Sequence, residues 1–141
     1  MSSRCLPFVR SVWESFRANS GLEPRLVDGN RLNILHGGTL ACMTDLGGSL
    51  AVASRGLFAT GVSTDLSVTY LNSGGKIGDT VRAEVTCDKF GKTLAYTSIR
   101  FTNTQNELVA RGSHTKFVAL AWKDPQNITD ELSPKPEKPA S

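Results

Sequence analysis

The spacing of hydrophobic residues divides this chain into two parts that meet near Gly56. Between residues 36 and 54, apolar side chains recur at steps of three and four, which is the spacing of one face of a helix. The residues between them are also mostly apolar, and a helix that is apolar on nearly all sides is enclosed by other structure. The pattern therefore predicts a buried helix over residues 36–54, which holds one carboxylate, Asp45.

Beyond Gly56, apolar and polar residues alternate, which predicts strands with one face on a core. Four such runs are separated by short polar or glycine-containing turns, at residues 60–72, 80–88, 93–102 and 108–119. Short turns between alternating runs favour an antiparallel meander. We therefore expect an α+β fold in which a curved antiparallel sheet wraps one side of the long helix. We expect a second subunit to cover the other side.

The two ends of the chain differ from this pattern. Residues 1–21 place Phe8, Val12 and Phe16 at helical spacing, which predicts an amphipathic helix that ends at Ser20-Gly21. The same segment is rich in arginine and poor in acids, so a mitochondrial transit peptide is the alternative. Residues 120–141 contain four prolines and few apolar groups, which predicts a disordered or loosely attached tail. Residues 22–119 are the expected folded domain, with at most a short strand at residues 25–27 before the long helix.

Composition narrows the class of protein only a little. Hydrophobic residues make up 39% of the chain and charged residues 21%, which is the balance of one globular domain. A net charge of +3 is too small to indicate nucleic-acid binding. Three cysteines without a CxxC pair indicate reduced thiols, so we expect an intracellular protein of the cytoplasm or the mitochondrion. The apolar runs are too short for a membrane span. Two histidines and a few scattered acids give no metal-binding pattern, so no metal is expected. No separate cofactor is expected either.

Asp45 and the glycines at the helix start give the first indication of chemistry. A carboxylate in an apolar helix is unfavourable to bury unless it is paired or neutralised, and a general base that takes a proton from water is one reason to keep it. Gly37 stands at the predicted helix N-terminus, where free N–H groups and the helix dipole stabilise an oxyanion. The two together predict hydrolysis of an ester or a thioester. The alternative for Asp45 is a structural acid whose hydrogen bonds are satisfied.

The spacing of these two residues predicts that one site needs two chains. Gly37 and Asp45 lie ~12 Å apart along a helix axis. A carbonyl carbon and its attacking water must lie within ~3 Å of each other. Two antiparallel helices from two chains remove the conflict, because the N-terminus of one then faces the middle of the other. We therefore expect a homodimer with two equivalent sites at its two-fold interface.

Four stretches of the sequence resemble a known family. They are LHGGTLACMTDLGG, GVSTDLSVTYLNSGGKIGDTVRAEV, GKTLAYTSIRFTN and ARGSHTKF, and the resemblance covers about residues 30–117. They are similar to the hotdog-fold acyl-CoA thioesterases of the thioesterase superfamily member 2 (acyl-CoA thioesterase 13) type, which are related to bacterial phenylacetyl-CoA thioesterases. The resemblance implies a hotdog fold, in which a curved sheet wraps a central helix, and dimers that pair into tetramers. It also implies hydrolysis of acyl-CoA to a carboxylic acid and free coenzyme A, within lipid metabolism.

The resemblance assigns roles to five candidate catalytic residues. It implies that Asp45 activates water, and that the Gly37 N–H and the Asn30 side chain of the partner chain hold the thioester carbonyl. It places His36 beside that carbonyl, and Ser63 where a hydroxyl positions the attacking water across the interface. Structural roles remain open for three of these residues. Asn30 can be a loop cap, His36 a structural residue beside the helix N-terminus, and Ser63 an ordinary strand serine.

The coenzyme A part of the substrate would run over the surface near the later strands. The candidates for its phosphates are Arg55, Lys92, His114 and Lys116. For His114 and Lys116 the alternative is a solvated strand face. The chain departs from the family pattern before Asn30, where Asp28-Gly29 stand, and this predicts that the leading strand is shortened or absent.

Two other functions fit the same sequence. A catalytically weak acyl-CoA-binding module would use the same cleft and would bind acyl-CoA without releasing a thiol. An acyl-CoA hydratase on the same fold is less favoured, because the histidine–acid pair that it needs is not evident in the helix. The sequence sets neither the acyl chain length nor the choice between dimer and tetramer.

Overall fold

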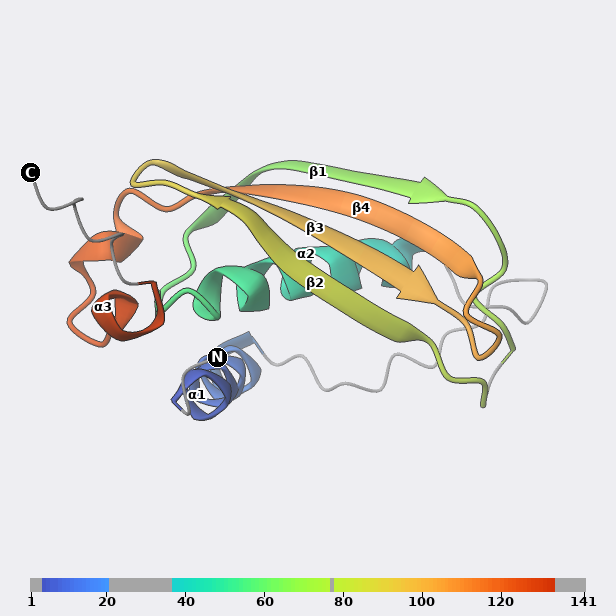
Figure 1. Ribbon diagram of the computed structural model, residues 1–141, viewed down its shortest axis with the longest axis horizontal. Coiled ribbons are helices and arrows are strands. Elements are labelled where there is room, and N and C mark those ends of the chain that lie inside the picture. The colour runs from blue at the N-terminus through green and yellow to red at the C-terminus, as the bar shows by residue number, and fades with distance from the viewer. Residues whose placement is uncertain (1–3, 21–36, 77, 134–141) are drawn as a thin grey trace, which may run out of the picture.

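The computed structural model describes residues 4–20, 37–76 and 78–133, with only the backbone described at residues 16–20. A curved four-stranded sheet arches over the long helix α2, and the helix α1 lies on the opposite side of α2 (Figure 1). The elements in chain order are α1 (Cys5–Ser20), α2 (Gly37–Ala53), β1 (Val62–Tyr70), β2 (Arg82–Phe90), β3 (Leu94–Thr102), β4 (Leu108–Phe117), the 3-10 helix η1 (Ala121–Lys123) and α3 (Thr129–Leu132). The predicted long helix and the four predicted strands are confirmed, and each end lies within two residues of its predicted position.

The strand order in the sheet is β1-β4-β3-β2, and every pairing is antiparallel. The meander is therefore confirmed for β2, β3 and β4 but is wrong for β1, which pairs with β4 and not with β2. The connection over residues 71–81 is too long for a tight hairpin, so it does not force β1 and β2 together. At its start, the N–H groups of Leu71 and Asn72 both donate to the carbonyl oxygen of Val109, which keeps the end of β1 on β4.

Two glycines allow α2 to lie close to the sheet. A Cβ atom at Gly47 would lie 2.8 Å from side-chain atoms of both Ile99 and Val85. A Cβ atom at Gly48 would lie 2.4 Å from Nδ1 of His114 and 2.7 Å from Oγ1 of Thr97. Real Cβ atoms do not approach other atoms so closely, so the helix could not hold this position with alanine at Gly48. The core beneath the helix has two apolar clusters: Leu40, Ile99, Phe101, Val109 and Ala110, and Val52, Leu57, Ala95, Val118 and Ala121.

The predicted opening helix is confirmed as α1, and its apolar side packs towards the C-terminal end of α2. Val12 is 1% exposed, and the ring of Phe8 meets that of Phe58 edge to face, with 6.2 Å between the ring centroids. The thiol of Cys5 lies 3.7 Å from the carbonyl oxygen of Ser54, just after α2. This helix therefore covers part of the side of α2 that the sheet leaves open.

The prediction of a loosely attached tail is wrong for residues 124–133. The N–H of Ile128 donates to the carbonyl oxygen of Gly56 at 2.8 Å, and the N–H of Phe58 donates to Oδ1 of Asn127 at 2.9 Å. Arg4, which directly precedes α1, forms an ion pair with Glu131 of α3 at 2.5 Å. Backbone groups at the end of α2 need partners, and this segment supplies them in spite of its polar composition. Residues 134–141 lie outside the described residues.

Candidate active site

Asp45 lies in the middle of α2, where side chains of the strands β1 and β4 reach its carboxylate. Its side chain is still 55% exposed, so the prediction of a buried carboxylate is wrong for the single chain. The helix α1 packs towards the C-terminal end of α2 and does not cover this carboxylate. Water can therefore approach it.

Two side chains from the sheet meet the carboxylate of Asp45. The hydroxyl of Ser63 on β1 donates to Oδ1 of Asp45 at 3.3 Å. Nε2 of His114 on β4 lies 3.3 Å from the same oxygen and 2.7 Å from Oγ of Ser63. An irregularity in the pairing of β1 with β4 falls between Ser63 and Asp65, where β1 shifts register next to the site. The three side chains therefore form one cluster within a single chain, and the role of Ser63 in positioning water across an interface stays a prediction.

His114 is 1% exposed, and its surroundings favour the neutral ring. Burial lowers the pKa of His114, and the nearby Lys116 cation lowers it further, while Asp45 acts in the opposite direction. Nδ1 is buried against Gly48 and has no hydrogen-bond partner among the described residues. A buried lone pair is easier to leave unpaired than a buried N–H group, so we assign the proton to Nε2, where the Ser63 hydroxyl can accept it. His114 then acts as a fixed donor to Ser63, with its ring beside Oδ1 of Asp45.

Lys116 is 3% exposed and lies between the sheet and α2. Its ammonium donates to Oγ of Ser49 at 2.5 Å and to Oγ1 of Thr60 at 3.3 Å. Burial lowers the pKa of Lys116, and the Asp45 charge opposes this shift. The interpretation of His114 and Lys116 as a solvated strand face is wrong, because this face of β4 lies against the helix.

The first turn of α2 is held by a contact that the sequence did not indicate. The hydroxyl of Tyr70, at the end of β1, donates to the carbonyl oxygen of Gly37 at 2.7 Å. A Cβ atom at Gly37 would lie 3.2 Å from the Tyr70 ring, so the absence of a side chain allows this ring to pack on the helix start. Helix N-termini carry N–H groups without acceptors in the helix, which suits the predicted oxyanion site. The candidates Asn30 and His36 lie outside the described residues.

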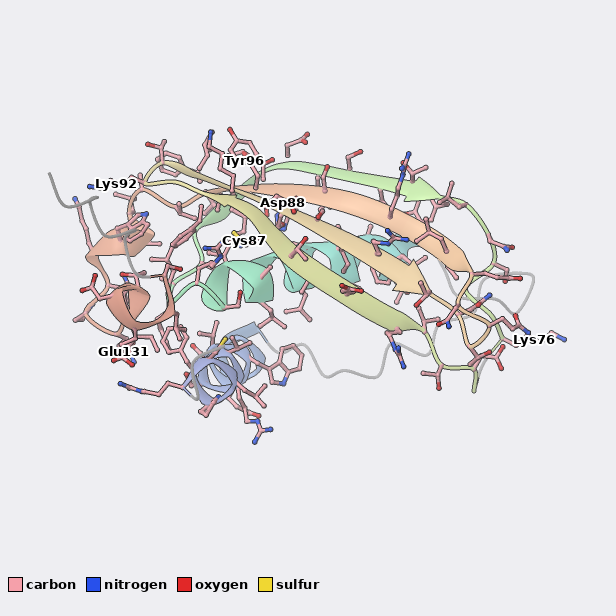
Figure 2. All side chains as sticks on the ribbon, in the orientation of Figure 1. Lys76, Cys87, Asp88, Lys92, Tyr96 and Glu131 are labelled. Carbon is pink, nitrogen blue, oxygen red and sulfur yellow. The ribbon has the colours of Figure 1, made fainter. Side chains whose placement is uncertain are left out.

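The four candidates for coenzyme A contacts do not lie together. Lys92 is exposed at the turn between β2 and β3, at the end of the sheet near α3 (Figure 2). The guanidinium of Arg55 donates to the carbonyl oxygen of Cys87 at 3.3 Å and lies 5.9 Å from the centroid of the Phe90 ring. His114 and Lys116 are interior, so their burial does not suit contact with a phosphate at the surface.

The alternation of β4 shows in the structure why His114 and Lys116 share one face. Burial on β4 alternates: Arg111 and Ser113 are exposed, while His114 and Lys116 are buried. A Cβ atom at Gly112 would touch the Thr44 side chain of α2, which places this set of alternate residues on the helix side. The alternation places His114 and Lys116 on one face of β4, and the pairing of β4 with β1 then brings His114 to Asp45.

Comparison with known proteins identifies the fold first and then the family. The crystal structure of thioesterase superfamily member 2 from Mus musculus superimposes with a TM-score of 0.66 at 31% identity, over 84% of this chain and 99% of that one, and this is the hotdog fold. The sequence model named "Thioesterase superfamily" matches residues 32–110. The match covers more than half of the chain, so the chain belongs to the thioesterase superfamily, and we class it as an enzyme that hydrolyses thioesters.

Two relatives agree with this assignment. A candidate esterase of Schizosaccharomyces pombe is 41% identical over 91% of this chain and 93% of its own length. Acyl-coenzyme A thioesterase 13 of Mus musculus is 41% identical over 63% of this chain and 64% of its own length. The second match thus spans a little under two thirds of that relative.

Within the described residues, no helix is both long and apolar enough to cross a bilayer.

Proposed function

We propose that this protein is an acyl-CoA thioesterase that hydrolyses acyl-CoA to a carboxylic acid and free coenzyme A. One observation carries the proposal: Oδ1 of Asp45 lies 3.3 Å from both the Ser63 hydroxyl and Nε2 of His114, on a helix of the hotdog fold. This arrangement suits a base that holds and activates water. The similarity to acyl-coenzyme A thioesterase 13 supports acyl-CoA as the substrate.

In the proposed mechanism, Asp45 takes a proton from a water molecule while the water oxygen attacks the thioester carbon. The Ser63 hydroxyl orients that water, and His114 holds Ser63, and through it Asp45, in place by donating from Nε2–H. The Gly37 N–H and the Asn30 side chain stabilise the negative oxygen of the tetrahedral intermediate. The C–S bond then breaks, the proton on Asp45 passes to the leaving sulfur, and the products are the acid and the coenzyme A thiol.

The two halves of this mechanism come from two copies of the chain. Gly37 and Asp45 occupy the same helix, ~12 Å apart along its axis, so one chain cannot supply both to one substrate. Exposed apolar side chains on β1, an edge strand of the described sheet, support a second copy there: Val62 is 63% exposed, Leu66 42% and Tyr70 52%. A homodimer is the smallest active unit in this proposal, and a tetramer and a role in lipid metabolism remain expectations from family resemblance.

Arg55 and Lys92 remain the proposed contacts for the phosphates of coenzyme A. Lys92 is exposed, and Arg55 is held beside Phe90 at the same end of the sheet. His114 and Lys116 are assigned to the interior of the site instead.

The test of this proposal is thiol release by the purified chain. We expect free coenzyme A thiol to appear, with one equivalent of acid, from at least one member of a panel of short, long and aromatic acyl-CoAs. Calorimetric binding of an acyl-CoA without thiol release would instead support the non-catalytic binding module. Loss of an enoyl-CoA without thiol release would support a hydratase.

A further inference from the structure

We propose that Lys116 is a positioning residue for the water-activating cluster: it anchors the helical turn that carries Asp45 and places a positive charge on the face of β4 that holds His114. Part of this inference rests on the proposed function, since it concerns how Asp45 and His114 are held for catalysis. The Lys116 ammonium is buried, and its two hydrogen-bond partners among the described residues are Ser49 and Thr60. Its action passes through Ser49 and through His114.

The first part of the inference rests on a chain of hydrogen bonds. The Lys116 ammonium donates to Oγ of Ser49, and the same hydroxyl donates to the backbone carbonyl oxygen of Asp45 at 3.1 Å. A second bond from Lys116 to Thr60 fixes the ammonium from the segment that precedes β1. The end of β4 is thus connected to the turn of α2 that begins at Asp45, and this turn determines where the carboxylate points.

The second observation is that the Lys116 ammonium is buried without a carboxylate beside it. Among the described residues, no carboxylate lies within ion-pair distance of the Lys116 ammonium, and its two hydrogen-bond partners are neutral hydroxyls. Burying a charge without an opposite charge is unfavourable, and an apolar side chain of similar volume is often at least as stable there. A purely structural role therefore explains Lys116 poorly, whereas a role in catalysis accounts for a cation at this position.

The third observation concerns the charge on His114. Lys116 stands two residues from His114 on the same face of β4, so its positive charge opposes a second positive charge on the imidazole. The titratable groups that act on this ring are Asp45 on α2, Asp65 on β1 and Lys116 on β4. The strand β3 presents the Thr97 hydroxyl, and Cys87 on β2 lies one strand further away. The two acids favour protonation of His114, burial raises the pKa of Cys87 so that its thiol is neutral, and Lys116 is the cation that opposes the acids.

The neutral state matters because of what a charged ring would do to the base. A protonated His114 would form a contact ion pair with the Asp45 carboxylate, which would hold that carboxylate less available to accept a proton from water. A neutral ring still donates from Nε2 to Ser63, whose hydroxyl donates to Asp45, and therefore holds the cluster without this competition. By disfavouring a positive charge on His114, Lys116 thus keeps the Asp45 carboxylate available as the base.

The test compares Lys116→Met, which removes the charge, with Lys116→Arg, which keeps it, and with Lys89→Met as a control at an exposed lysine of β2. The imidazole signals are titrated by NMR; the chain has two histidines, and the His114 signal is identified by its loss in His114→Gln. We expect the pKa of His114 to be higher in Lys116→Met than in the wild type. In Lys116→Arg, which keeps the charge, we expect it to stay close to the wild-type value, and in Lys89→Met we expect no change. The His36 signal serves as the internal reference.

Two further readouts separate positioning from a structural role. We expect Lys116→Met to lower kcat by about tenfold or more with little change in KM. We expect its melting temperature to equal or exceed that of the wild type. An unchanged His114 pKa together with unchanged kcat would overturn the inference, as would a fall in melting temperature with the His114 pKa unaltered.

Ser49→Ala keeps the test decisive if the lysine variants fail to fold. This variant removes the hydroxyl between Lys116 and the Asp45 carbonyl, and we expect it to lower kcat without altering the His114 pKa. Unchanged kcat in Ser49→Ala would overturn the anchoring part of the inference. If the wild type releases no thiol but the His114 pKa still rises in Lys116→Met, the proposed function fails while the effect of Lys116 on His114 stands.

Discussion

Asp45→Asn is expected to lower kcat for acyl-CoA hydrolysis by about 10²–10⁴-fold, because the amide cannot take a proton from water. The amide has the same shape as the carboxylate, and its oxygen can still accept the hydrogen bond from Ser63 beside His114. KM is therefore expected to change little, and kcat and kcat/KM to fall together. The measurement is steady-state thiol release with the acyl-CoA that the wild type turns over fastest.

The control for this variant is Asp65→Asn, two residues beyond Ser63 on β1. Asp65 is also exposed and lies outside the contact cluster of Asp45, so its kcat is expected to stay within about twofold of the wild type. Since the Asp45 side chain is 55% exposed, the variant at that position is expected to melt within a few degrees of the wild type. Full turnover by Asp45→Asn would contradict the assignment of this residue as the base.

Gly48→Ala is expected to reduce both stability and activity. The new Cβ atom would meet the Cβ of His114 at 2.9 Å and Nδ1 of the same ring at 2.4 Å, and neither atom belongs to a flexible end. Either α2 moves away from the sheet or His114 moves away from Asp45. Such overpacking costs about 1–3 kcal/mol, while the better helix propensity of alanine returns ~1 kcal/mol of it. Thermal unfolding and kcat are the two measurements.

Gly47→Ala provides the matched comparison on the same helix. It gains the same helix propensity, but its Cβ atom meets terminal methyl groups of Ile99 and Val85, which can rotate away more easily. We expect its kcat to stay near the wild-type value and its stability to exceed that of Gly48→Ala. Equal loss of activity in both variants would indicate that helix position alone, and not the placement of His114, determines turnover.

The sequence predicted the local structure better than the arrangement of the strands. The long helix and the strands follow from periodicity, because hydrophobic spacing reports which side of an element is buried. The pairing of β1 with β4 does not, because it joins residues about fifty positions apart and depends on the path of the long connection between β1 and β2. Periodicity also could not reveal that the polar segment at residues 124–133 packs on the end of α2, since its attachment consists of hydrogen bonds to backbone groups.

The sequence indicated only those site residues that interrupt a local pattern. Asp45 and Gly37 stand out within the helix because a lone carboxylate and paired glycines break an apolar pattern. His114 and Lys116 do not stand out, because they sit in a strand with many polar residues, and only the register with β1 reveals that they face the helix. The hydrogen bond from Tyr70 to Gly37 likewise depends on where β1 ends relative to the start of α2.

The central claim is that one chain holds the water-activating half of the site and its partner holds the half that binds the carbonyl. The direct test mixes two inactive chains, Asp45→Asn and Asn30→Ala, and purifies the dimer that contains one of each. If the halves come from different chains, one of the two sites in this dimer has both halves intact, and we expect about half of the wild-type activity. If both halves come from one chain, every site carries a defect, and a mixed dimer no more active than its parents would contradict the claim.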